Sequence, residues 1–416
     1  MKGSIKQRSP GSYSIILDLG KDPVTGKRRQ KWHTFRGTKR GADIECARLI
    51  TELEKNEYVE ASKLTIGQWI DQWIEAGAPG RRRKKVSQRT LERYGQLLRT
   101  HIKPVLGHRL LQKLRAPEID KLYADMAEAK LISARTQHHV HTVLGACLAT
   151  AHRKGLISAN PMLRVEQVPA PEQFDPDDDE TDDIGEGLSE NELAALITGF
   201  KPSGIFPAVV LAAATGARRN ELLALRWTDL DADKKTLRIE RALEQTKKFG
   251  IRIKPPKTKR GYRTIDLDDG TIAVLLKEKE RQQRLCAGVP GDAKVDLSLI
   301  RLPHDALMFP ALSVSFTTPR HPRNFSRDFA DRIARLSEER AKQNLPGLTA
   351  RFHDLRGIHA TALLDAGVAL HTVAQRIGDD PATLLRFYTK RKRSQQANEK
   401  LSETIKGLAA GFLSAG

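Results

Sequence analysis

Apolar and polar residues alternate differently along three stretches of the chain, and the first of them predicts strands. An alternating stretch, GSYSIILDL, is followed by a turn at DPVTGK and by a second, basic alternating stretch, RRQKWHTF. A period of two is typical of β-strands. Apolar residues then recur at helical spacing from Ala42 to Leu53. We therefore predict a small sheet with one helix over residues 1–60.

The second stretch, residues 64–168, is predicted to be entirely helical. In LTIGQWIDQWIEAG, Thr65 can cap a helix whose Ile66, Trp69 and Trp73 share one face. Further helical patterns follow in RTLERYGQLLRTHIKPVLG, APEIDKLYADMAEAK and SARTQHHVHTVLGACLATAHRKG.

Residues 169–187 are predicted to be an extended linker. Nine acidic residues and no basic ones lie between Glu172 and Glu186, and such a run repels itself. The run is interpreted as a solvated spacer; the alternative is that it visits a basic DNA groove when DNA is absent.

The third stretch, residues 188–416, mixes helices with short strands. Ser189 and Glu192 form a capping box before an apolar helical face. The buried helical run VVLAAATG then leads into ARRNELLALRWTDLD, where Arg218 and Glu221 are within reach across one helical turn.

Two strand-like stretches, TLRIERALE and YRTIDL, predict a β-hairpin region with Lys257 and Lys259 near its turn. A helical run, TIAVLLKEKERQQR, follows, and the chain is then predicted to be rich in loops to about Leu348.

The stretch HDLRGIHATALLDAG predicts a helix that starts at His353, carries Arg356 one turn later and ends at Gly367. A further amphipathic helical pattern precedes Asp380. Asp380 and Pro381 suit the N-cap and the first position of a final helix, which carries Tyr388.

Charge narrows the class of partner. With 71 Lys and Arg against 51 Asp and Glu, the chain has a formal charge of +20, which favours phosphate-rich polyanions such as nucleic acid. Three scattered cysteines indicate a reducing compartment and argue against a disulfide framework or a zinc site. No apolar run approaches the roughly 18 residues of a membrane span, so no membrane partner is expected and the location is predicted to be cytoplasmic.

Four ordered blocks give this chain a family resemblance. TGARRNELLALRWTDLD, PKTKRGYRTIDL, HDLRGIHATALLDAG and IGDDPATLLRFYTK together resemble the catalytic domain of the tyrosine recombinases, the phage integrase family. Residues 64–168 look like that family's helical core-binding domain, and residues 1–60 like its small arm-type DNA-binding domain. The resemblance implies a multidomain α+β fold. It would comprise a sheet-plus-helix unit, an all-α SAM-like core-binding domain, the acidic linker at residues 169–187, and a mainly α catalytic domain with a small antiparallel sheet at 188–416.

The resemblance also implies roles for the site residues, and the chemistry of a phosphodiester asks for the same groups. Arg218 and Arg356 would neutralise the phosphate oxygens, because guanidinium forks bind phosphate and stay charged. Tyr388 would be the nucleophile. Lys257 would protonate the leaving 5′-oxygen, with Lys259 as the alternative on the same turn. His353 would orient the phosphate or accept the tyrosine proton.

Asp379 departs from the family pattern. It completes the expected catalytic set at a position, nine residues before the tyrosine, where the family usually has histidine or tryptophan. Those residues can donate a hydrogen bond to the phosphate, whereas an ionised carboxylate repels it. We expect this carboxyl group to be protonated, turned away, or paired with a cation such as Arg376 or Lys390.

Double-stranded DNA attachment sites are the expected partner. The basic run is interpreted as a phosphate-tracking loop, with a solvated face as the alternative; its residues are Arg81, Arg82, Arg83, Lys84 and Lys85. Lys259 joins this set of DNA-binding candidates. The family resemblance implies a homotetramer on DNA in a bacterial host, associated with the nucleoid, and accessory DNA-bending or directionality proteins as further partners. No cofactor and no metal are expected.

Two functions of different classes follow. The favoured one is a site-specific recombinase that integrates or excises a mobile DNA element. The alternative is a DNA-binding relic of the same fold with impaired strand transfer. A type IB topoisomerase-like enzyme would share the chemistry, but the N-terminal sheet unit argues for recognition of paired sites.

Overall fold

The computed structural model describes residues 2–21, 28–54, 59, 61–80, 86–130, 132–169, 188, 190–256, 258–291, 293–312 and 314–390. At residues 2, 19, 21, 29, 52–54, 190 and 386–390 it describes the backbone alone. The chain forms two compact units, residues 1–177 and 178–416. The domain limits given above stay a prediction.

The N-terminal segment folds into a three-stranded antiparallel sheet with one helix. Its elements are β1 (Lys2–Ser9), β2 (Ser12–Lys21), β3 (Arg28–Arg36) and α1 (Lys39–Glu54). Ile15 and Leu17 of β2 are buried against Cys46 and Leu49 of α1. Strand β1 was not predicted, because KGSIKQRS carries one large apolar residue and so gives no clear alternation.

Helices make up the rest of the first unit. They are α2 (Ile66–Glu75), α3 (Gln88–Leu97), the π-helical turn η1 (Leu98–Ile102), α4 (Lys103–Leu106), η2 (Leu111–Lys113), α5 (Ala116–Glu128), α6 (Ala134–Arg153) and η3 (Pro161–Arg164). The predicted cap is confirmed: the Thr65 hydroxyl accepts from the Gln68 backbone N–H at 3.3 Å. The π-helical turn interrupts the predicted helical pattern RTLERYGQLLRTHIKPVLG, and Pro104, which cannot donate a helical hydrogen bond, lies two residues after it.

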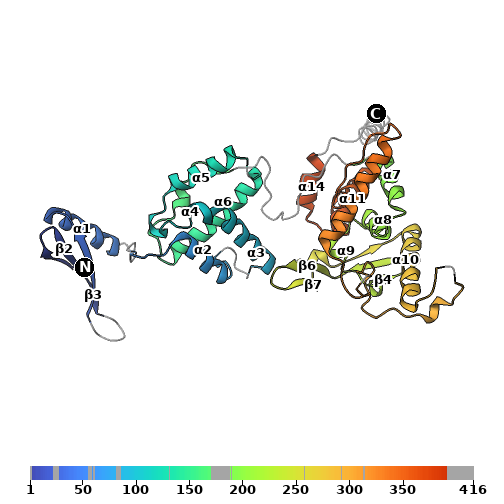
Figure 1. Cartoon of the computed structure of the whole chain (residues 1–416), viewed down its shortest axis with the longest axis horizontal. Coiled ribbons are helices and arrows are strands. Elements are labelled where there is room, and N and C mark those ends of the chain that lie inside the picture. The colour runs from blue at the N-terminus through green and yellow to red at the C-terminus, as the bar shows by residue number, and fades with distance from the viewer. Residues whose placement is uncertain are drawn as a thin grey trace, which may run out of the picture. The chain divides into compact units, whose positions relative to one another are not determined.

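The second unit contains the remaining elements. They are α7 (Glu190–Phe200), α8 (Phe206–Thr215), α9 (Arg219–Leu222), η4 (Trp227–Asp229), β4 (Leu230–Asp231), β5 (Thr236–Ile239), β6 (Ala242–Thr246), β7 (Gly250–Lys254), η5 (Lys259–Gly261), β8 (Arg263–Asp266), α10 (Asp269–Ala287), η6 (Leu297–Leu299), α11 (Pro322–Ala341), α12 (Asp354–Asp365), α13 (Leu370–Ile377) and α14 (Pro381–Lys390). Figure 1 shows α7, α8 and α11 close together on one side of this unit. The fold is therefore mixed, mainly helical, with small antiparallel sheets, as the sequence predicts.

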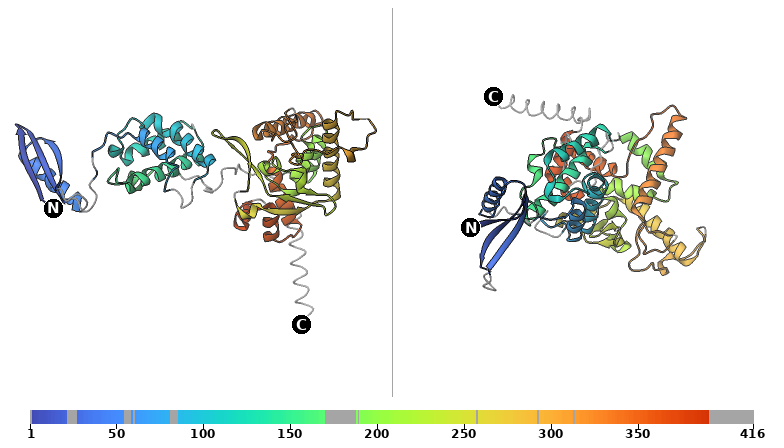
Figure 2. Two further views of the ribbon diagram at one scale, coloured as in Figure 1. Left: turned by 90° about the horizontal axis from the view of Figure 1, so that it is seen from below. Right: turned by 60° about the vertical axis from the view of Figure 1, so that its left-hand side comes forward.

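The predicted hairpin region is more elaborate than expected. Strands β5 and β8 pair antiparallel, with Leu237 opposite Ile265. Between them the chain forms a second, two-stranded ribbon, β6 with β7, which projects from the body of the unit (Figure 2). Glu244 of the ribbon binds Arg252 and Lys254, so GIRIK, which was not predicted to be a strand, is held by backbone pairing and by charge.

The prediction of a loop-rich stretch up to Leu348 was wrong at α11. This helix has 20 residues, and its Phe325, Phe329, Ile333 and Leu336 are buried at helical spacing. The rings of Phe325 and Phe329 both contact Phe352 edge-on, with centroids 4.9 and 5.5 Å away. Many charged residues between these positions obscured the helical pattern.

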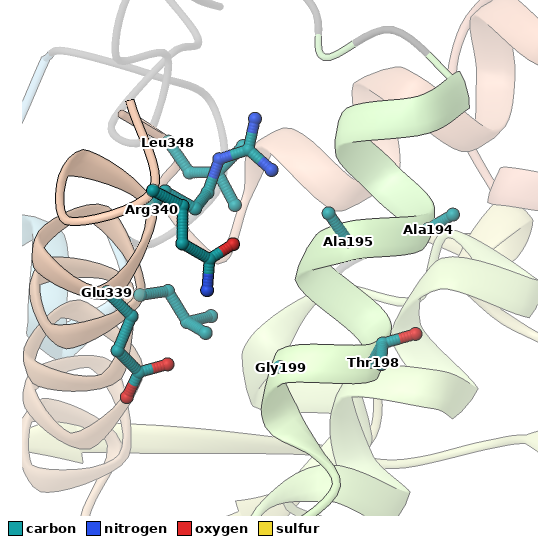
Figure 3. Close-up of a pocket in the computed structure, with 9 residues that line it drawn as sticks. Ala194, Ala195, Thr198, Gly199, Glu339, Arg340 and Leu348 are labelled. Carbon is teal, nitrogen blue, oxygen red and sulfur yellow. The ribbon is translucent and has the colours of Figure 1, made fainter. Parts of the chain in front are cut away.

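A pocket of about 450 Å³ lies between α7 and α11 (Figure 3). Gly199 on α7 lets the helices approach closely, because a Cβ atom there would lie 2.3 Å from Leu336. Within the described ranges, no helix is long and apolar enough to cross a membrane.

Candidate active site

Arg218 is placed by a sharp turn between two helices. The apolar helix α8 ends at Gly216, whose φ of 62° is left-handed, and α9 begins directly after Arg218. The left-handed backbone favours glycine at this position, and a Cβ atom there would also be a tight fit, at 3.1 Å from both His359 and Ile377. The turn leaves the Arg218 side chain about one third exposed.

Glu221 holds Arg218 from the buried side. One carboxylate oxygen accepts from Arg218 Nη1 at 3.1 Å, and the other from Arg263 Nη2 at 2.7 Å. Burial alone would raise the pKa of Glu221, but the charges of Arg263 and Arg218 outweigh it and lower that pKa to about 2. Glu221 is therefore ionised at neutral pH and fixes one edge of the Arg218 guanidinium.

Arg356 reaches the same place from α12 and is buried. Its Nη1 donates to the carbonyl oxygens of Gly216, at 2.7 Å, and Ile377, at 2.8 Å. Burial and then the like charge of Arg218 lower the pKa of Arg356 to about 10, far enough above neutrality to keep it cationic. The side chain thus joins the α8–α9 turn to the end of α13.

Asp379 bridges the two arginines. Its Oδ1 accepts from Arg218 Nη2 at 2.5 Å and its Oδ2 from Arg356 Nη2 at 2.6 Å. Burial would raise the pKa of Asp379, but the charges of Arg356 and Arg218 hold it below its ordinary value, so the carboxylate is ionised. We call Arg218, Arg356, Asp379, Glu221 and Arg263 the arginine cluster.

This geometry corrects the expectation for Asp379. Of the three alternatives, pairing with a cation is the one found, but the partners are Arg218 and Arg356 and not the suggested Arg376. The lowered pKa argues against a protonated carboxyl group, and the side chain is not turned away from the site. Arg376 instead donates to the carbonyl oxygens of Ala214 and Asp266 and to the His359 ring. The side chain of Lys390 lies outside the described part of the chain.

The structure describes only some of the other predicted catalytic residues. His353 is the N-cap residue of α12, half-buried and one turn before Arg356. Tyr388 lies in α14, which begins as predicted with Asp380 Oδ1 accepting from the Ala382 N–H at 3.0 Å, but its side chain is not among those described. Lys257 and the basic run at residues 81–85 also lie outside the described residues.

Lys259 lies in η5, on an exposed turn that touches the end of α13. A Cβ atom at Gly378 would lie 2.9 Å from the Arg260 carbonyl oxygen, and Arg260 is ion-paired with Asp380. The turn that carries Lys259 and Arg260 therefore lies beside the residues that flank Asp379.

Arg263 was missed by the sequence reasoning. It lies two residues before the buried Ile265 along β8 and so on the same face of the strand; it therefore points inward, where a charged side chain requires a partner. The sequence YRTIDL contained that signal. No local pattern indicated that the partner of Arg263 would be Glu221, 42 residues earlier.

No group of three or more His, Cys, Asp or Glu side chains suited to a metal ion occurs among the residues that the structure describes.

The sequence of this chain matches two family descriptions. Residues 193–395 match the phage integrase family, and residues 65–127 match the phage integrase N-terminal SAM-like domain. Both matches fall on the segments that carry the sequence resemblance.

Known relatives align over most of the chain. An integrase of Saccharopolyspora erythraea is 26% identical over 431 residues, which cover 90% of this chain and 89% of that protein. A tyrosine recombinase XerC-like protein of Caldanaerobacter subterraneus subsp. tengcongensis is 24% identical, covering 88% of each.

Solved structures share the fold. The Tn1549 transposon integrase bound to a circular intermediate DNA superposes with a TM-score of 0.57 at 19% identity, covering 82% of this chain and 99% of that one. A lambda integrase tetramer bound to a Holliday junction gives 0.53 at 17% identity, covering 94% and 97%. These structures show the fold alone. The family matches and the aligned relatives, together with the ordered motifs, show that the chain belongs to the phage integrase family of tyrosine recombinases.

Proposed function

We propose that this enzyme is a site-specific DNA recombinase that integrates or excises a mobile element, with Arg218 and Arg356 holding the scissile phosphate. One observation carries the proposal: two guanidinium groups, one from the α8–α9 turn and one from α12, converge on a single anion, the Asp379 carboxylate. Guanidinium pairs bind phosphate oxygens in the same way. Nothing in the comparisons favours the alternative of a catalytically impaired relic.

The proposed reaction is a transesterification. The Tyr388 oxygen attacks the phosphorus atom and gives its proton to a base, for which His353 is the candidate; the P–O5′ bond breaks as the P–O(Tyr) bond forms. Lys257 protonates the departing 5′-oxygen, with Lys259 as the alternative. The products are a 3′-phosphotyrosyl ester and a free 5′-hydroxyl group.

Rejoining needs no added energy source. The phosphotyrosyl ester retains the phosphate in a bond of similar reactivity, so a 5′-hydroxyl group from another duplex can attack it and release Tyr388. Trapping of a covalent complex on a nicked suicide site tests cleavage. Strand exchange between two duplexes then separates a recombinase from a relaxing enzyme, which would rejoin only its own strand.

Cleavage is expected to survive EDTA. Arg218 and Arg356 already neutralise the phosphate oxygens, which is one of the roles that a metal ion plays in other phosphoryl-transfer sites. The measurement is covalent-complex yield with and without chelator at constant ionic strength. A requirement for added magnesium would contradict the assignment of the arginines.

DNA and an oligomer of this chain are the proposed partners. The formal charge of +20 favours DNA, and one fold relative is a lambda integrase tetramer on a Holliday junction. We propose a homotetramer on DNA for this chain, and accessory DNA-bending or directionality proteins as further partners. Action on DNA implies an intracellular location near the nucleoid.

The N-terminal sheet is proposed to bind a second class of DNA site. On the face opposite α1, Trp32 is 58% exposed, and its pairing with Ile16 places Thr34 and Lys6 on the same face. A sheet with basic, hydroxyl and aromatic side chains on its free face can contact base edges and phosphates in a major groove.

Deleting residues 1–60 is expected to preserve cleavage of a core site and to impair integration that needs distant arm sites by about tenfold or more. The helical segment and the catalytic segment retain separate cores, so they should fold without the sheet. Covalent-complex formation and integration are measured side by side. An equal loss of cleavage and integration would show that the sheet is needed to hold the core DNA site as well.

A further inference from the structure

The Asp379 carboxylate occupies the place that the proposed function gives to the DNA phosphate. Each of its oxygens is bound by a different guanidinium, at 2.5 Å from Arg218 and 2.6 Å from Arg356. Two non-bridging oxygens of a phosphodiester present the same pattern, a pair of anionic acceptors on one atom. The donors that face Asp379 are therefore those that a phosphate would use.

The Nη1 atoms of both arginines have other partners. Arg356 Nη1 is bound to the carbonyl oxygens of Gly216 and Ile377, and Arg218 Nη1 is bound to Glu221. The guanidinium groups are thus fixed in orientation by contacts that do not involve Asp379. A phosphate that binds them edge-on has to take over the contacts now made by that carboxylate.

Charge balance supports an exchange of one anion for another. The arginine cluster holds three guanidinium groups and two carboxylates, which leaves one positive charge. When Asp379 leaves, two remain, and a phosphodiester with one negative charge restores the original balance. Binding both anions at once would place two negative charges together in a partly buried site, which is unfavourable.

The local structure allows the side chain to leave without unfolding the helices. The Asp379 backbone N–H donates to the Ala374 carbonyl oxygen at 2.9 Å, and Gly378 ends α13 in a left-handed conformation. These contacts hold the backbone, whereas the side chain is one quarter exposed. Rotation of that side chain toward solvent is sufficient to open the site.

We propose that Asp379 is an internal substitute for the scissile phosphate, which closes the site in the DNA-free enzyme and is displaced when DNA binds. The inference rests on the proposed function of Arg218 and Arg356. It makes Asp379 a residue that regulates access to the site. In the DNA-free protein the carboxylate keeps two neighbouring like charges paired.

The first test uses Asp379→Asn, which removes the charge and keeps the shape. If the carboxylate fills the site about nine tenths of the time, it weakens apparent DNA affinity about tenfold. The DNA concentration that gives half-maximal covalent-complex formation should therefore fall about tenfold in this variant. Asp380→Asn is the matched control, because it removes the adjacent charge, keeps a capping side chain, and has its ion pair with Arg260 outside the cluster. It should leave that concentration unchanged.

The second test needs neither DNA nor cleavage. Sulfate, an unreactive tetrahedral anion, is titrated against the melting temperature of the DNA-free protein. Asp379→Asn should show a saturable stabilisation of several degrees above the general salt effect seen in wild type and in Asp380→Asn. Adding Arg218→Gln should remove that gain. This result would hold even if no variant cleaved DNA. The proposed role of Asp379 and the proposed function can therefore fail separately.

Contrary results are equally clear. An unchanged half-saturating DNA concentration with a slower maximal rate, and no sulfate gain, would make Asp379 a fixed positioning residue and overturn the proposal. If Asp379→Asn does not fold, Asp379→His at pH 8 repeats both tests. If neither neutral variant folds, the carboxylate is required for folding, and the proposal that DNA displaces it is overturned.

Discussion

Replacing Tyr388 by phenylalanine is expected to abolish covalent attachment to DNA, by about 10⁴-fold or more, as removal of a nucleophile does in other enzymes. The substitution deletes one oxygen atom and keeps an aromatic ring, so DNA binding should remain nearly intact. Covalent-complex formation on a nicked site and a binding assay without cleavage measure the two effects. The effect is the largest expected here, because no other group supplies the bond to phosphorus.

Tyr262→Phe is the control for this prediction. Tyr262 is half exposed and lies between η5 and β8, in the same unit as Tyr388. It loses the same atom and should keep full attachment activity. If attachment persisted in Tyr388→Phe and disappeared in Tyr262→Phe, Tyr262 would be the nucleophile.

Local sequence signals predicted local structure well. Thr65 caps α2 and Asp380 caps α14 as predicted, because each cap depends on contacts within a few residues. The pair of Arg218 and Glu221, predicted from their spacing, is present at 3.1 Å. The four ordered motifs were enough to identify the family.

Features that depend on distant residues were predicted less well. Strands β5 and β8 pair with each other, although the β6–β7 ribbon lies between them in the sequence. No local sequence pattern predicts such an insertion. Arg376 and Lys390, neighbours in sequence, were the cations suggested as partners of Asp379, yet it binds Arg218, which lies 161 residues away. Tertiary folding brings those groups together, and only their charges were visible in the sequence.

His359 has a structural role. Its Nδ1 lies 2.9 Å from the Ala213 carbonyl oxygen, and its Nε2 accepts from Arg376. Burial, and then the charge of Arg376, lower the pKa of His359 to about 4. The ring is neutral at pH 7 and links α12 to α8 behind the arginine cluster.

Glu221→Gln is expected to destabilise the protein by about 3 kcal/mol or more at pH 7. The substitution leaves the buried guanidinium of Arg263 without its charged partner, and breaking a buried ion pair from one side carries a cost of that size. Chemical denaturation measures the loss. Glu244→Gln is the control: Glu244 is equally buried, but its partners Arg252 and Lys254 are more than one third exposed and can be solvated, so its loss should be smaller.

The pH dependence of stability separates this ion pair from simple packing. The folded-state pKa of Glu221, about 2, lies below its ordinary value of 4.5, so the folded protein holds the carboxylate ionised more strongly than the unfolded chain does. Its contribution is therefore fully present above about pH 4.5 and is lost as pH falls toward about 2. Wild type and Glu221→Gln should converge in stability over that interval, whereas a packing defect would keep them apart at every pH. A constant difference between pH 7 and pH 3 would show that shape, and not charge, accounts for the role of Glu221 beneath Arg218.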